Sequence, residues 1–136
     1  MFYIYYLYEN EQMKDEEKLY ETLGELLYVV AKADGVIQDD EREAIQNLLK
    51  NHKSAEEIKW SFNYEESKDK SLDSVYDKVI AVCHRIGPSP IYNEFIEAMN
   101  IVANADKKMH DEESQVVNSF SADLIERFKR DIDLLK

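Results

Sequence analysis

The chain has 136 residues, a length typical of one domain that buries a hydrophobic core without disulfides or a structural metal. Its formal net charge of -12, from 29 acidic and 17 basic residues, repels phosphate backbones and anionic membranes, so we expect no nucleic-acid partner. A single cysteine, Cys83, excludes an intramolecular disulfide and is typical of a reducing compartment, which favours a cytoplasmic location.

The N-terminal segment, residues 1–14, is rich in aromatic residues but lacks the features of a signal peptide. It has no leading positive charge and no small-residue cleavage site after its short apolar run. No later run approaches the roughly 20 apolar residues of a membrane helix, so we expect no membrane insertion. We expect this segment to pack on the rest of the domain. The alternative is a homodimer contact, because tyrosines such as Tyr3 and Tyr6 are enriched at interfaces.

Apolar residues at helical spacing predict the first two helices. The stripe of the first helix consists of Leu19, Leu23, Leu26, Leu27 and Val30. The second helix is predicted to begin near Asp39 or Asp40, because Asp40 and Glu43 have the spacing of a capping box.

The middle of the chain predicts a short third helix, a loop and a longer fourth helix. Ser54 and Glu57 have capping-box spacing before the third helix. The polar stretch 63–71 lacks periodicity and is predicted to be the main surface loop. An apolar pattern over residues 72–86 predicts the fourth helix, which Gly87 and Pro88 end.

The last third of the chain predicts two more helices. Ser89 as N-cap and Pro90 at the first helical position open one of them. Apolar residues then recur at helical spacing from Asp111 to the end, with a break predicted near Ser121. The fold class is therefore all-α, a compact bundle of about six to seven helices in a single domain, residues 1–136.

An internal repeat relates two helix-turn-helix units. A shift of 72 residues, which carries Asp34 onto Asp106, aligns YVVAKADGVIQDDEREAIQNL with NIVANADKKMHDEESQVVNSF without a gap. Both copies have an apolar run that ends in Ala-Asp, an apolar residue three positions later, and acids that open the next helix. Two units of one design are therefore predicted.

The first turn matches only the second half of a calcium-binding EF-hand loop. With Asp34 at position 5, Gly35 falls at position 6 and Glu41 at position 12, as that loop requires. Positions 1 and 3 become Val30 and Lys32, which cannot be ligands of a hard cation. The pattern therefore does not predict an EF-hand, and the second copy departs further from it.

The pair KADGVIQDDE and NADKKMHDEE, in an acidic helical chain, resembles the TerB-like domain of bacterial tellurite-resistance and stress proteins. The resemblance extends from the first helix to about Leu124. It implies a compact helical bundle, a cytosolic bacterial setting, and a divalent metal bound by clustered acids. Carried onto this chain, those acids are Asp34, Glu41, Asp106 and Glu113, with Asp39 and Asp111 as further members. Lys107 and Lys108 depart from the family pattern, because they put two cations beside the second turn.

Two functions and one purely structural interpretation follow. The acids could serve only as caps and turn residues, each stabilising a helix N-terminus by up to about 1 kcal/mol. A weak Ca²⁺-like or Mg²⁺-like site requires the two turns to face each other and pool their carboxylates. A protein-interaction module of a stress system requires an exposed apolar or aromatic surface. Its predicted contact residues are Trp60, Phe62, Tyr3 and Tyr6.

No pattern in the sequence predicts an enzyme. Phosphate-binding loops, the zinc motif H-E-x-x-H and the nucleophile motif G-x-S-x-G do not occur. His52, His84 and His110 are scattered along the chain, and no spacing selects an acid and base pair. We therefore predict a non-enzymatic protein with no catalytic residues.

Overall fold

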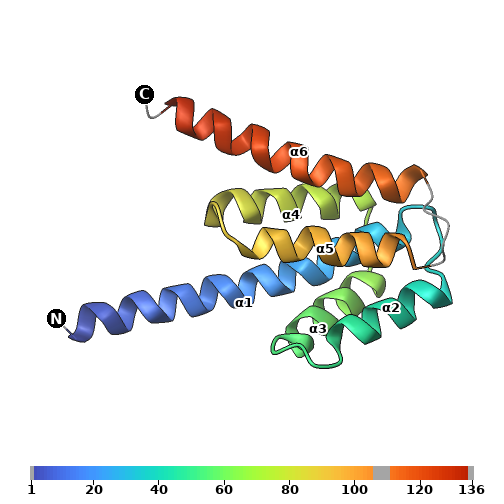
Figure 1. The fold of residues 1–136 in the computed structure, drawn as a ribbon, viewed down its shortest axis with the longest axis horizontal. Coiled ribbons are helices and arrows are strands. Elements are labelled where there is room, and N and C mark those ends of the chain that lie inside the picture. Colours follow the sequence, from blue (N-terminus) through green and yellow to red (C-terminus); the bar gives the residue numbers. More distant parts are fainter. Residues whose placement is uncertain (1, 106–110, 135–136) are drawn as a thin grey trace.

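The computed structural model describes residues 2–105 and 111–134 (Figure 1), which form six helices. These are α1 (Phe2–Lys32), α2 (Asp39–Leu49), α3 (Ala55–Glu66), α4 (Leu72–Ile86), α5 (Ile91–Ala103) and α6 (Asp111–Leu134). No strand occurs among the described residues, which confirms the all-α prediction.

The first helix, α1, is the central element of the bundle. It contacts α3, α4, α5 and α6, and its N-terminal part extends beyond the other helices (Figure 1). All five residues of the predicted apolar stripe are buried. Tyr20, Tyr28 and Val29 are buried as well, because helices cover this part of α1 on several sides. This central position explains why α1 contributes so much of the hydrophobic core.

The third helix, α3, packs closely against α1 at Gly24. A Cβ atom at Gly24 would lie 2.2 Å from the carbonyl oxygen of Ile58 and 2.9 Å from the Cβ atom of Ser61. Glycine is therefore required at this crossing. The predicted loop over residues 63–71 is wrong in its first part, because α3 continues to Glu66 and the loop covers only residues 67–71.

Glycine also ends α4, as predicted. Gly87 has a φ of 92°, a left-handed conformation that other residues rarely adopt. The hydroxyl of Tyr92 donates to the carbonyl oxygen of Gly87 at 2.8 Å, which ties the start of α5 to the turn. The helix α5 begins one residue later than Pro90, the predicted first position. The predicted break near Ser121 is wrong, since α6 is continuous there.

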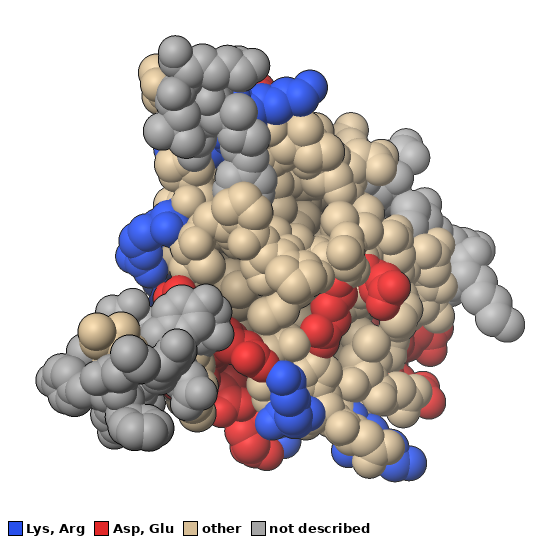
Figure 2. All heavy atoms as spheres, turned by 60° about the vertical axis from the view of Figure 1, so that its left-hand side comes forward, with Lys and Arg blue, Asp and Glu red and all other residues tan. Residues whose placement is uncertain are grey.

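Charged side chains are unevenly distributed over the end of the molecule at which both termini lie. In Figure 2 basic side chains lie at the top, at the left margin and in the lower part of this view, acidic side chains lie from just right of the centre downward, and the upper middle is largely uncharged. Across the described helices, none combines the length and the apolar character needed to span a bilayer.

Candidate functional site

Asp34, the acid of the first turn, has a structural partner. The Oδ1 atom of Asp34 accepts a hydrogen bond from the N–H of Val36 at 3.2 Å. Gly35 has a φ of 101°, so the turn requires the conformational freedom of glycine at this position. Asp34 therefore stabilises the turn between α1 and α2.

The capping box of α2 differs in register from the prediction. The N–H of Gln38 donates to the Oε1 atom of Glu41 at 2.8 Å, so Gln38 is the N-cap and Glu41 is its partner. The predicted box of Asp40 and Glu43 is therefore wrong. Ser54 is the N-cap of α3, but its side chain makes no capping hydrogen bond.

The two copies of the repeat place one glutamate alike. Glu41 in α2 and Glu113 in α6 are each only 1% exposed. Asp39 is exposed at the start of α2. Asp106 and the side chain of Asp111 lie outside the described residues. The equivalent burial of Glu41 and Glu113 agrees with the predicted repeat.

The end of α1 and the start of α2 lie at the same end of the bundle as the end of α5 and the start of α6 (Figure 1). Asp40 of α2 and Ala105 after α5 line one surface hollow. Ala33 after α1 and Glu112 of α6 line a second hollow. Among the side chains that the structure describes, however, no three histidine, cysteine or acidic groups come together in a way that could hold a metal ion. The contacts that the structure gives for Asp34 and Glu41 are a turn contact and a helix cap.

An aromatic pair on α3 is exposed. The Trp60 side chain is 63% exposed and stacks on Tyr64, with 5.3 Å between ring centroids. The Nζ atoms of Lys68 and Lys70 lie 5.1 and 5.5 Å from the Tyr64 ring centroid. Tyr64 was not among the predicted contact residues, although its i, i+4 spacing from Trp60 could have indicated it.

The other predicted contact residues differ from Trp60. Phe62 points to the core, where its ring lies edge-on to Tyr28 with 6.0 Å between centroids. It is only 5% exposed, because a helical step of two residues turns it away from the side of Trp60. The side chains of Tyr3 and Tyr6 lie outside the described residues.

Two buried glutamates share one partly exposed lysine where α1, α3 and α4 meet. The Nζ atom of Lys78 lies 2.8 Å from Oε1 of Glu65 and 3.4 Å from Oε1 of Glu25. The Oε2 atoms of both glutamates are buried and have no hydrogen-bond partner in the part of the chain described. Burial raises the pKa of Glu25, and the nearby Glu65 raises it further, while Lys78 opposes the shift. One lysine therefore serves two buried carboxylates.

A second polar cluster involves His52, which lies between α2 and α3. The N–H of Ser54 donates to Nδ1 of His52 at 2.9 Å, so Nδ1 is an acceptor and the proton of the neutral ring is on Nε2. That Nε2 atom lies 2.5 Å from Oε1 of Glu94, whose Oε2 atom accepts from the Tyr20 hydroxyl at 2.7 Å. The cluster ties α1 and α5 to the α2–α3 turn. Burial and Glu94 together raise the pKa of Tyr20 above its ordinary value.

The single cysteine is buried in the core, as its place in an apolar helix indicates. Burial raises the pKa of the Cys83 thiol to about 12. The thiolate, which is the nucleophilic form, is therefore suppressed at neutral pH. Cys83 acts as a small apolar group of the core.

These features define an all-helical acidic bundle with two related helix-turn-helix units. A comparison with protein families matches residues 21–133 to the family described as tellurite resistance protein TerB. The match covers most of the chain, and the protein belongs to this family. Searches of curated proteins and of solved structures found no match.

Proposed function

We propose that the protein is a non-enzymatic protein-interaction module of a cytoplasmic tellurite-resistance or stress-response system. The observation that carries this proposal is the exposed stacked pair of Trp60 and Tyr64 on α3. Tryptophan and tyrosine are enriched at protein interfaces, where they bury a large apolar area with little loss of side-chain entropy. The family supports a stress-associated setting, and the pair supports a contact surface.

A photocross-linking amino acid at position 60 tests this proposal. We expect it to capture a discrete partner in cells from which the gene derives, and Tyr64→Ala to weaken that capture. The same amino acid at Ile125 is the matched control, because Ile125 is also an exposed apolar residue but belongs to α6, on the other side of the bundle (Figure 1). Equal capture from both positions, or none from position 60, would contradict the proposed surface.

Binding of a divalent cation is the second function that we consider. The observation in its favour is that the helix ends flanking both acidic turns, α1 with α2 and α5 with α6, lie at one end of the bundle, which a shared site requires. The hydrogen bonds of Asp34 and Glu41 with backbone N–H groups leave fewer lone pairs for a cation. Any binding of Ca²⁺ or Mg²⁺ is therefore expected to be weak.

An NMR titration of the chelator-stripped protein with Ca²⁺ or Mg²⁺ tests the second function. A shared site predicts saturable shifts of the amide signals in both turns, including that of Gly35. The double variant Asp34→Asn, Asp106→Asn should lose these shifts. Unchanged signals up to millimolar ion would leave the acids as caps and turn residues.

A further inference from the structure

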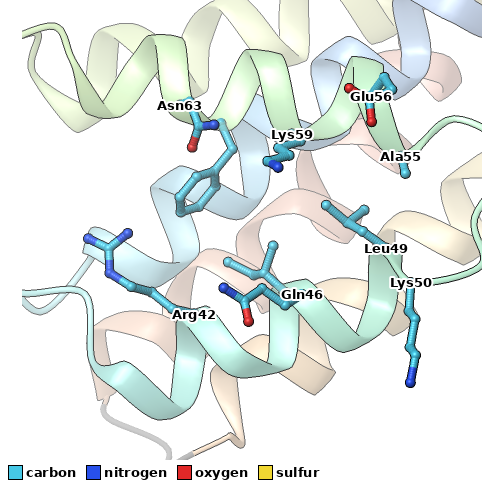
Figure 3. Close-up of a pocket in the computed structure, with 10 residues that line it drawn as sticks. Arg42, Gln46, Leu49, Lys50, Ala55, Glu56, Lys59 and Asn63 are labelled. Atoms are coloured by element: carbon cyan, nitrogen blue, oxygen red, sulfur yellow. The ribbon is translucent and has the colours of Figure 1, made fainter.

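An open groove of about 440 Å³ separates α2 from α3 (Figure 3). The two helices diverge because α3 packs mainly on α1, whereas α2 packs on α5. The groove is lined chiefly by Arg42, Ile45, Leu49, Lys50, Lys59 and Phe62. From Arg42 to Lys50 the groove extends about 12 Å along α2, or roughly two helical turns.

The lining combines an apolar floor with cations. Leu49 and Lys59 project into the space between the helices, and Lys50 lies at the end of α2 (Figure 3). Arg42 binds Glu66 with two hydrogen bonds, which link α2 to the end of α3. Neither Lys50 nor Lys59 has an ion-pair partner among the described residues. The two lysines therefore contribute positive charge to the groove that no described ion pair offsets.

The charge of this groove is opposite to that of the molecule. The chain has 29 acidic and 17 basic residues. The groove is lined by three cations and a single acid, Glu56, and one of the cations, Arg42, is already paired with Glu66. An acidic ligand would gain attraction here, whereas the net charge of -12 repels it over most of the surface.

We propose that this groove binds an amphipathic helix of a partner protein, whose apolar side chains enter between α2 and α3 and whose flanking carboxylates face Lys50 and Lys59. The inference rests on the protein-interaction function proposed above and specifies the chemistry of the partner. It also places a contact on α3 beside the Trp60–Tyr64 pair.

The walls of the groove favour a helix over an extended peptide. An extended peptide binds by adding a strand to a sheet edge with unpaired backbone groups. Both walls here are helices, whose backbone N–H and C=O groups are paired within each helix except at the ends. A partner helix needs only an apolar groove that accepts its side chains at positions i, i+3 and i+4. Two turns of a partner helix match the length of the groove between α2 and α3.

Two synthetic peptides of about three helical turns test the proposal by NMR titration of the whole chain. Both carry leucines on one face, and their flanking residues are glutamates in one peptide and lysines in the other. We expect the acidic peptide to produce saturable shifts at the amides of α2 and α3, including Gln46 and Asn63. The basic peptide should produce none, because Lys59 and Lys50 repel it.

Charge reversal provides the decisive variant. In Lys50→Glu, Lys59→Glu we expect the acidic peptide to bind roughly ten-fold more weakly and the basic peptide to gain binding. An inverted preference cannot result from unfolding. The matched control is Lys14→Glu, Lys129→Glu, which changes the net charge equally at exposed positions of α1 and α6 and should leave the affinity for the acidic peptide unchanged.

Several results would contradict the proposal that this groove binds an acidic amphipathic helix. These are equal binding of the two peptides, shifts that map outside α2 and α3, and displacement of the acidic peptide by dodecanoate at equal concentration, which would identify a small anionic amphiphile as the occupant. Self-association that protects the same amides would identify a second copy instead. Partner capture at position 60 without any peptide response would leave the interaction function standing and reject this groove alone.

Discussion

At the scale of single residues, Lys78 has the clearest energetic role. It supplies the positive charge nearest to Glu65, which is only 1% exposed, and it also pairs with Glu25. A buried carboxylate without a cation carries a desolvation cost that no attraction offsets. The stability of the packing between α1, α3 and α4 therefore depends on Lys78, a single lysine at the edge of the buried region.

We expect Lys78→Met to lower the free energy of unfolding by about 3 kcal/mol at neutral pH, because it leaves Glu65 buried and uncompensated. Urea denaturation monitored by circular dichroism measures this loss. Lys59→Met is the matched control and should change stability by less than about 0.5 kcal/mol, since Lys59 has no described ion pair. Adding Glu65→Gln to Lys78→Met should restore part of the loss, and failure to do so would assign the effect to packing.

Glu25 gives a prediction with a defined dependence on pH. Burial raises its pKa above the ordinary 4.5, so the folded protein holds this proton more tightly than the unfolded chain. Wild-type stability contributed by Glu25 is therefore greatest below the ordinary pKa and falls as pH rises from there through the folded-state pKa. We expect Glu25→Gln to be more stable than wild type above this window and equal to it below, when urea denaturation is repeated from about pH 4 to about pH 8.

Glu66 is a control for Glu25, because its contribution to stability should depend on pH in the opposite direction. The hydrogen bonds from Arg42 lower the pKa of Glu66. Its contribution to stability is therefore present above the ordinary pKa and is lost as pH falls through the folded-state pKa. Glu66→Gln should be less stable than wild type at neutral pH and should approach it in acid. The same sign for both variants would reject this account of the two glutamates.

At the scale of helices, the crossing of α1 and α3 depends on the absence of a side chain at Gly24. A Cβ atom there would meet the carbonyl oxygen of Ile58, a backbone atom that no rotamer change can move. We expect Gly24→Ala to cost about 2 kcal/mol net, because overpacking exceeds the gain in helix propensity. Thermal unfolding measures the loss. Glu17→Ala, at an exposed position of the same helix, should be close to neutral.

The sequence largely predicted which segments form helices, because the spacing of apolar residues follows the side of each helix that is buried. The stripe from Leu19 to Val30 and the stop at Gly87 are examples that the structure confirms. The extension of α3 to Glu66 was not predictable, because Glu65 is a charged residue that is buried in this structure, where it pairs with Lys78 of another helix. The register of the α2 cap was missed because several neighbouring acids offer equivalent spacing.

The repeat was predictable, but most of the surface chemistry was not. The exposure of Trp60 follows from its place on α3, and the sequence indicated it as a contact residue. The same reasoning included Phe62, because an aromatic residue alone does not reveal which side of a helix it occupies. The positive charge of the groove could not be predicted from the sequence. Lys50 and Lys59 line the same groove only because α2 and α3 are positioned next to it in the folded chain.

At the scale of the whole molecule, the net charge of -12 opposes compactness. Like charges repel over about 30 Å at 0.01 M salt but over only about 10 Å at 0.1 M, so added salt relieves this repulsion. Ion pairs within the fold, such as Arg42 with Glu66, are weakened by the same screening. Because acids outnumber cations, the repulsive contribution should dominate.

We therefore expect the Tm to rise as NaCl increases from about 10 mM to about 150 mM in the presence of a chelator. A fall in Tm would mean that local ion pairs outweigh the overall repulsion. Replacing NaCl by MgCl₂ at equal ionic strength then separates screening from binding, because a ligand of the folded state adds stability in proportion to the logarithm of its concentration. An additional rise that Asp34→Asn, Asp106→Asn abolishes would locate Mg²⁺ at the paired turns, whereas an equal rise in both salts would assign the effect to charge screening.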